Sequence, residues 1–274
     1  MTATTIEFEK DYPVAEIRLN RPDKLNAVNA AMNQELCAAF EDVENDDEVR
    51  VIILSGNGRA FSAGFDLNFS ERDSGASEND HVRRELERAF DLIMRIWDCP
   101  KPTIAAVHGY CLGSSMEISA VCDITVAADD CRFGAPEVRF GSGIVCMILP
   151  WMIGTKNAKE ILLEGSNDID ATRAEAIGLV NRVVAASDLI AEARAQANQI
   201  ALNDPLAVRL TKKAINQSLE AAGMRDALRA ALETDIEIET TDTPESREFN
   251  EILASHGTRA ALAWRAALSP DAEK

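Results

Sequence analysis

The sequence lacks any run of apolar residues close to the roughly 18 that a membrane-spanning helix needs. Its first dozen residues, MTATTIEFEKDY, also lack the basic and apolar regions of a signal peptide and the arginine-rich, acid-poor character of a transit peptide. The apolar fraction of 46% is that of a chain with a sizeable hydrophobic core. We therefore expect a soluble, cytoplasmic protein.

Basic residues are scarce relative to acids. The chain has 28 lysines and arginines against 46 aspartates and glutamates, which leaves a net charge of −18. A surface of this charge repels nucleic acids and anionic membranes. We therefore predict no nucleic-acid or membrane partner, and an anionic ligand would need a local cationic patch.

Metal-binding and phosphate-binding motifs are absent as well. The sequence contains no CxxC pair, no HExxH and no GK[ST], and its histidines His81, His108 and His256 lie far apart. The segment GNGRAF lacks the last glycine of a dinucleotide loop, and GSSME fails the GxSxG pattern of a serine nucleophile at its fifth position. No metal site is indicated. We interpret the six cysteines as reduced, mostly buried residues: Cys37, Cys99, Cys111, Cys122, Cys131 and Cys146.

Strand and helix patterns alternate through the first two-thirds of the chain. Short apolar runs predict strands at VAEIRLN, RVIIL, TIAAVHG and DITVAA. Apolar residues at helical spacing predict helices from Met32 to Val43 and from Val82 to Trp97, and GSSMEISAVC is a third. From Ser187 the pattern is helical, with breaks near 203–205, 223 and 243–244. This order predicts an α/β body over residues 1–190 and a helical region over 191–274.

Glu117 is the only acid or base between Cys111 and Cys122. A carboxylate in such apolar surroundings needs hydrogen-bond partners, or its pKa rises toward values that suit general acid–base catalysis. Alternatively, Glu117 faces solvent at the start of a helix, where an acid interacts favourably with the helix dipole. The residues leave both interpretations open.

Glu137 follows the turn signal Phe133–Pro136, and it too has a structural explanation as an acid in a first helical turn. A strand separates Glu137 from Glu117, so the chain can return the second acid to the first. This spacing permits a shared site without requiring one.

Two glycine-containing segments offer backbone N–H donors. Gly113-Ser114-Ser115 opens the helix of Glu117, and Ala63-Gly64-Phe65-Asp66 lies in a loop. Two converging donors would form an oxyanion hole for a carbonyl oxygen. The alternative is that the glycines serve only turns and packing.

Several segments together resemble the enoyl-CoA hydratase/isomerase (crotonase) family. In order, they are LNRPDKLNAVN, VRVIILSGNGRAFSAGFDL, KPTIAAVHGYCLGSSMEISAVCDITVAA, CRFGAPEVRFG and AEAIGLVNRVV. The resemblance covers roughly residues 6–250. It implies a crotonase-like spiral of stacked ββα units. It also implies that the C-terminal helices help to build a homotrimer or a dimer of trimers.

The resemblance also implies an enoyl-CoA hydratase, a hydro-lyase acting on an acyl-CoA thioester. Glu117 would activate water for attack on Cβ, and Glu137 would supply a proton to Cα. The N–H groups of Phe65 and Ser114 would hold the thioester oxygen. Residues on the CoA side would be Lys24, Asn26, Ala63, Asp66 and Leu67. The reaction needs no cofactor, because CoA is part of the substrate.

The chain departs from the family pattern beside the expected acyl pocket. Phe65 replaces a small residue, Ser114 replaces a glycine, and Ser142–Gly154 replaces a glycine-rich run. The acyl group and the pathway therefore stay open. Three other functions are possible on the same scaffold. They are an enoyl-CoA isomerase, a hydrolase of acyl-CoA thioesters or of the carbon–carbon bonds of β-dicarbonyl compounds, and a non-catalytic CoA-binding subunit.

Overall fold

The computed structural model of the chain describes residues 4–67 and 77–268. Its main β-sheet has six strands in the order β1-β2-β3-β4-β6-β9. The β1–β2 pair is antiparallel and the remaining pairs are parallel. The bounds are β1 Ile6–Asp11, β2 Val14–Leu19, β3 Val51–Gly56, β4 Thr103–Val107, β6 Ile124–Ala128 and β9 Arg182–Val184.

A smaller sheet of three strands, in the order β5-β7-β8, continues the α/β body. Its strands are β5 Tyr110–Leu112, β7 Arg132–Gly134 and β8 Ile169–Asp170. The β5–β7 pair is parallel, and it sets the segment before Ser114 beside the segment before Glu137. This sheet therefore brings the two candidate glutamates toward one place.

One face of the main sheet is covered by helices α1 (Ala30–Glu44), α2 (Glu78–Asp98) and α3 (Ser114–Val121). The periodic residues of α1 and α2 contribute to the core on this face, as their spacing predicts. The Asn29 side chain caps α1 by accepting the Met32 N–H at 3.0 Å. The predicted strands and helices of the α/β body are thus confirmed.

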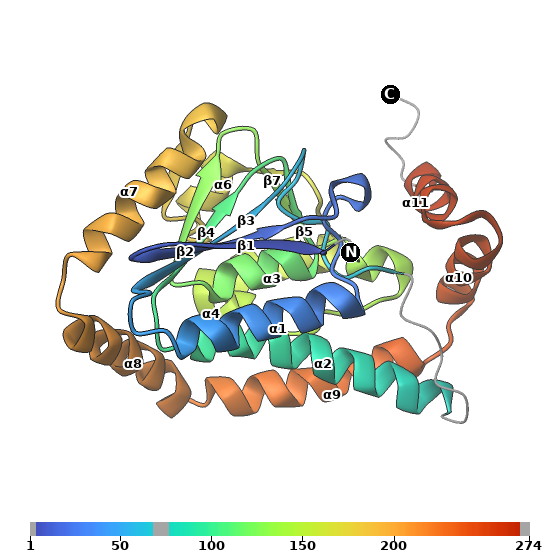
Figure 1. Cartoon of the computed structure of the whole chain (residues 1–274). Helices are drawn as coiled ribbons and strands as arrows, with labels where there is room; N and C mark the ends of the chain where they lie inside the picture. Colours follow the sequence, from blue (N-terminus) through green and yellow to red (C-terminus); the bar gives the residue numbers. More distant parts are fainter. Residues whose placement is uncertain (1–3, 68–76, 269–274) are drawn as a thin grey trace.

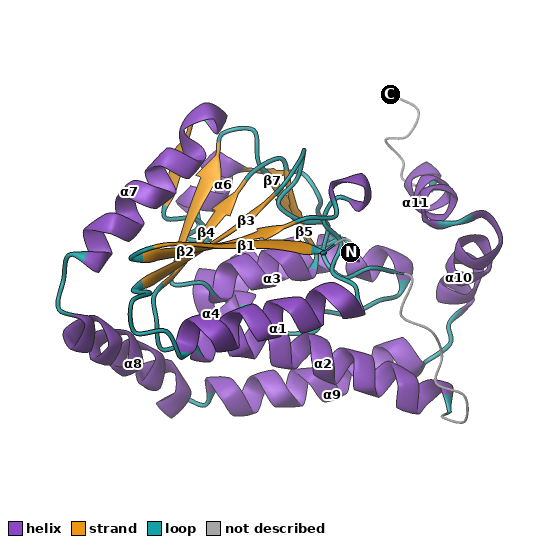
Figure 2. Cartoon of the chain, viewed as in Figure 1, coloured by secondary structure: helices purple, strands orange, loops and turns teal. Residues whose placement is uncertain are grey.

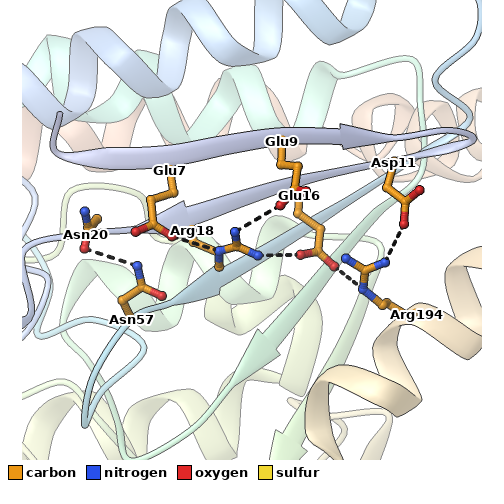
Figure 3. Close-up of polar contacts among 8 residues, drawn as sticks. All are labelled: Glu7, Glu9, Asp11, Glu16, Arg18, Asn20, Asn57 and Arg194. Carbon is orange, nitrogen blue, oxygen red and sulfur yellow. Dashed lines mark hydrogen bonds and ion pairs between the residues drawn. The ribbon is translucent and has the colours of Figure 1, made fainter.

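Helix α7 (Leu189–Ala201) covers the opposite face and buries Leu189, Ala193 and Ala197 against the sheet (Figure 1). On this side the buried Glu16 of β2 pairs with Arg18 at 2.8 Å and with Arg194 of α7 at 2.6 Å (Figure 3). The contact between Arg194 Nε and Glu16 Oε1 is an ion pair that lacks hydrogen-bond geometry. Charged pairs therefore join β2 to α7.

The C-terminal region is helical, as predicted (Figure 2). The expected breaks coincide with helix starts, because Asp204, Gly223 and Thr243 are the N-caps of α8, α9 and α10. Helix α9 packs against α2, which places it beneath the body in Figure 1. The C-terminal helices are α8 Pro205–Ala221, α9 Met224–Thr240, α10 Pro244–His256 and α11 Thr258–Ala267.

Short helices complete the fold between the sheets and the C-terminal region. They are η1 Pro22–Lys24, η2 Glu137–Phe140, α4 Leu149–Ile153, α5 Thr155–Glu164, α6 Ala171–Ala176 and η3 Ala186–Asp188. The sequence patterns did not predict β1 or the smaller sheet, whose strands are short. The division at residue 190 stays a prediction and falls inside α7. In the part of the chain that the structure describes, no helix is long and apolar enough to cross a lipid bilayer.

Candidate active site

Glu117 lies in α3, a helix whose residues are all buried. Its Oε1 accepts a hydrogen bond from the backbone N–H of Cys146 at 2.8 Å, while Oε2 is buried without a partner among the described residues. Burial raises the pKa of Glu117 well above its ordinary value, and the neighbouring Glu137 carboxyl raises it further. The alternative that Glu117 faces solvent is therefore wrong.

Glu137 begins η2, directly after Pro136. Its carboxyl lies against Gly113, the N-cap of α3, because a Cβ added at Gly113 would overlap Glu137 Oε1. Burial raises the pKa of Glu137 to about 8. Its Oε2 is buried and, among the described residues, unpartnered. The structure thus brings together the two acids that the sequence singled out.

The backbone donors of Phe65 and Ser114 lie at the same place. The Cα of Gly64 packs against Leu112 and Ser114, since a Cβ added there would lie 2.9 Å from Leu112 O and 3.1 Å from Ser114 N. Both glycines that shape this contact, Gly64 and Gly113, have φ values of +90° and +60°. Neither the Phe65 N–H nor the Ser114 N–H donates to an acceptor within residues 4–67 and 77–268. The arrangement suits two donors that converge on one oxygen.

Asn26 is fully buried and holds the loop that carries Phe65. Its Nδ2 donates to the carbonyls of Asn57 and Ala60 at 2.8 Å and of Phe61 at 3.1 Å. Its Oδ1 accepts the Arg21 N–H at 2.8 Å. These bonds assign the Asn26 side chain to positioning the loop, while a direct contact with CoA stays a prediction.

The other residues expected on the CoA side lie around the same loop. Lys24 ends η1 and is exposed, and Ala63, Asp66 and Leu67 are partly buried. The Arg21 guanidinium pairs with Asp66 at 3.0 Å and donates to the Ala27 carbonyl. This ion pair ties the loop of Asp66 to the segment before α1.

Helix α9 contributes two acids that the sequence analysis missed. Asp235 is buried, with neither carboxyl oxygen hydrogen-bonded to a described residue. Glu239 accepts hydrogen bonds from the Ser142 hydroxyl and from the Gly143 N–H, the latter at 3.3 Å. A signal was present, because Asp235 occupies the same helical face as the buried Leu228, Leu232 and Ile236.

A cavity of about 400 Å³ lies beside the loop of Phe65 and Asp66, and α1 and α2 form its other walls. Its position makes it a candidate for part of an extended ligand. A second cavity, of about 410 Å³, includes none of the candidate residues in its lining. Of these two cavities, the first therefore adjoins the site.

The geometry combines two buried carboxyls with two backbone donors. Adjacent buried carboxyls do not both ionise readily, so such a pair holds one proton over a range of pH. One acid and one base beside an oxyanion hole can add or remove a proton next to a carbonyl group. Among the described residues, no cluster of side chains is suited to hold a metal ion.

Comparisons with known proteins point to a single family. The family profile described as enoyl-CoA hydratase/isomerase matches residues 9–255. The short-chain-enoyl-CoA hydratase of Clostridium acetobutylicum is 37% identical over 231 residues, covering 80% of this chain and 84% of the relative. The crotonyl-CoA hydratase of Syntrophomonas wolfei is 35% identical over 226 residues, with coverage of 80% and 84%.

A solved structure matches almost the whole chain. The crystal structure of an enoyl-CoA hydratase/isomerase from Xanthobacter autotrophicus Py2 is similar with a TM-score of 0.93 and 46% identity, covering 98% of this chain and 100% of that one. The expected crotonase-like fold is thereby confirmed. With its profile match, its relatives and its fold in agreement, the chain belongs to the enoyl-CoA hydratase/isomerase family.

Proposed function

We propose that the protein is an enoyl-CoA hydratase, which adds water across the 2,3 double bond of a trans-2-enoyl-CoA. The observation that carries the proposal is the pair of buried carboxyls, Glu117 and Glu137, at the N-terminus of α3. Hydration needs one base for water and one acid for Cα, and this pair supplies both. The hydratase names of the relatives support the same activity.

In the proposed mechanism, the Glu117 carboxylate positions a water molecule and accepts its proton as the oxygen attacks Cβ. Glu137 gives its proton to Cα. The N–H groups of Phe65 and Ser114 stabilise the negative charge that develops on the thioester oxygen. Water supplies the hydroxyl group directly. The proton that Glu117 takes from water then passes to Glu137 and replaces the one that Glu137 gave to Cα. Overall, one water molecule is added and both glutamates return to their starting states. The addition is redox-neutral overall and so needs no redox cofactor. In this proposal Glu117 and Glu137 carry out both proton transfers, and no metal ion takes part.

Residues around the loop of Phe65 would bind the CoA part. Because the chain has a net charge of −18, binding of the CoA phosphates needs a local cation. Lys24 is exposed and can form an ion pair with them. Ala63, Asp66 and Leu67 would line the path of the pantetheine arm. The cavity beside Phe65 and Asp66 supports this placement, because it adjoins the proposed oxyanion hole.

The test is a panel of short, long, branched and ring-bearing trans-2-enoyl-CoA substrates. We expect at least one of them to lose the absorbance of its conjugated thioester as water adds. Inactivity across the panel would contradict the hydratase proposal. Release of free thiol would indicate a hydrolase, movement of the double bond an isomerase, and tight CoA binding without turnover a binding subunit.

We also propose that the protein assembles as a homotrimer or a dimer of trimers. Helix α8 has no buried residue in the single chain and exposes Leu206, Leu210 and Ile215. Exposed apolar side chains grouped on one helix are typical of an interaction surface. Sedimentation should give three or six times the chain mass, whereas a monomer would contradict this assembly. The cytoplasmic location and the absence of nucleic-acid and membrane partners stay predictions from composition.

A further inference from the structure

Helix α9 contacts Ser142 and Gly143, which lie in the chain between Glu137 and Cys146, the residue whose N–H binds Glu117. The Ser142 hydroxyl and the Gly143 N–H both donate to Oε1 of Glu239. Asp235, one turn earlier on α9, lies against the same segment, because a Cβ added at Gly143 would overlap its Oδ1. Glu239 and Asp235 therefore face the active-site segment and not open solvent.

The segment from residue 137 to residue 146 is short, and each of its ends belongs to the proposed active site. Glu137 lies in η2, which ends at Phe140, and Cys146 donates its N–H to Glu117 at 2.8 Å. Ser142 and Gly143 lie between these two points. A shift of Ser142 and Gly143 would thus alter the spacing of both catalytic carboxyls.

The ionisable side chains that the described part of the chain brings together at this place are all carboxyls. Burial raises the pKa of Asp235 to about 7 and also raises the pKa of Glu239, as it does for Glu117 and Glu137. None of the ion pairs formed within the described ranges includes any of these four side chains. Four neighbouring carboxyls without a cation cannot all be ionised near neutral pH.

Hydrogen bonds distinguish the two buried acids of α9, Asp235 and Glu239, in how well each stabilises a negative charge. Glu239 accepts two hydrogen bonds, which favour its charged form. Asp235 accepts none from the described residues, so its neutral form is favoured by comparison. Of these two acids, Glu239 therefore carries a negative charge more readily than Asp235.

The groups that act on the Glu137 carboxyl come from two elements. They are Glu117 on α3, and Asp235 and Glu239 on α9. Helices α5 and α10 also pack near η2, but through Arg139 against Gly165 and through Ser246 against Gly141. Within the described ranges, no basic side chain shifts the pKa of Glu137 or of Glu239.

We propose that Glu239 is a positioning residue of the active site. Its carboxylate holds Ser142 and Gly143, and its negative charge keeps Glu137 in the protonated form that donates to Cα. This inference rests on the proposed hydratase function for the role of Glu137. A purely structural role for Glu239 would hold the segment without affecting the protonation of Glu137.

The experiment follows the protonated carboxyl of Glu137 directly. Infrared difference spectra against pH identify its C=O band as the one that Glu137→Gln removes. In Glu239→Gln, which keeps an acceptor oxygen but removes the charge, the titration midpoint of this band should fall by about one pH unit. The matched control is Glu237→Gln, an exposed residue on the same helix, which should leave the midpoint unchanged.

A kinetic measurement should follow the spectra. The alkaline limb of the kcat/KM profile should move to lower pH in Glu239→Gln, since Glu137 then loses its proton earlier, with a larger change in kcat than in KM. If Glu239→Gln does not fold, Ser142→Ala is the second variant. Loss of the hydroxyl donor should make the Glu239 charge less stable and move the midpoint in the same direction by a smaller amount.

The proposal is overturned if the midpoint of the Glu137 band is the same in the folded variants and in the parent protein. The proposed function fails separately. A parent protein that hydrates no enoyl-CoA, yet shows the midpoint shift in Glu239→Gln, would overturn the hydratase function and with it the catalytic meaning of the shift, while the electrostatic link between Glu239 and Glu137 would stand.

Discussion

At the scale of single residues, the two glutamates differ in what surrounds them. Glu117 is fully buried and has one hydrogen-bond donor, the Cys146 N–H. Glu137 lies at the start of a short helix and faces the N-cap of α3. Because each carboxyl raises the cost of charging the other, the singly protonated pair is favoured. That state contains the base and the acid that hydration requires.

Glu117→Gln and Glu137→Gln should each lower kcat/KM by about two or more orders of magnitude, since a glutamine neither accepts nor gives the proton. Steady-state kinetics on an accepted enoyl-CoA would check this, with Glu237→Gln as an exposed control that retains full activity. A large loss in only one of the two variants would instead support a one-acid mechanism such as isomerisation.

Asp235 should make the stability of the protein depend on pH. Its pKa is raised by burial from 3.8 to about 7, so the folded state holds this proton more tightly than the unfolded state. Its stabilising contribution is complete below about pH 4 and is lost as pH rises through about 7. Charging Asp235 in the folded protein costs on the order of 2–4 kcal/mol.

The substitution Asp235→Asn removes this titration. We expect the variant to have a larger free energy of unfolding than the parent protein at pH 8, and the difference to shrink toward pH 5. Urea unfolding at both pH values would measure it, with the exposed Asp47→Asn as the control. Equal pH dependence in the parent and in Asp235→Asn would show that Asp235 does not titrate in this range.

At the scale of elements, the N-terminus of α3 depends on close contacts between backbone and carboxyl. Gly113 has φ +60°, and its Cα lies against the Glu137 carboxyl. Gly64 has φ +90° and approaches Leu112 and Ser114. Any side chain at Gly113 must therefore displace the acid or tilt the start of the helix.

Gly113→Ala should reduce kcat/KM by about one hundredfold or more, because the added methyl group displaces Glu137 from its position. The matched control is Gly178→Ala, which has φ +82° but no atom within 4 Å of an added Cβ. Both variants should lose about 1 kcal/mol of stability from backbone strain, as measured by thermal unfolding, but only Gly113→Ala should lose activity. Equal activity losses would mean that strain, and not contact, is responsible.

At the scale of the whole molecule, ion pairs between β2 and α7 join the sheet to the helical region. Arg194 of α7 contacts Glu16 and, at 2.9 Å, Asp11 of β1 (Figure 3). Arg18 contacts Glu16 and also Glu7 of β1, at 3.1 Å. The buried Glu16 thus has a cation on each side.

Arg194→Gln should lower the free energy of unfolding by about 1–2 kcal/mol, because the buried Glu16 loses one cation and keeps the other. Activity should not change, since Arg194 lies outside the site. Urea unfolding would measure the loss, and the exposed Arg209→Gln on α8 is the control. A loss no larger than that of the control would show that the pair does not stabilise the assembly of α7 on the sheet.

The local sequence pattern was sufficient to predict many of the helices and strands of this protein. The spacing of Met32, Leu36, Phe40 and Val43 predicted the buried face of α1, and Pro205 with its neighbours predicted the start of α8. These features depend on residues within a few positions of one another, so the sequence displays them directly. The order of the family motifs likewise determined the family and the positions of the two glutamates.

Only the tertiary structure decided how those glutamates are surrounded. Glu117 meets Cys146, which is 29 positions away, and Ser142 and Gly143 meet Glu239, which is 97 and 96 positions away. Asn26 proved to be a buried support of the loop, a role that depends on carbonyls 31 to 35 positions away. The burial of a carboxyl and its partners depend on how distant segments pack, and no local period encodes that packing.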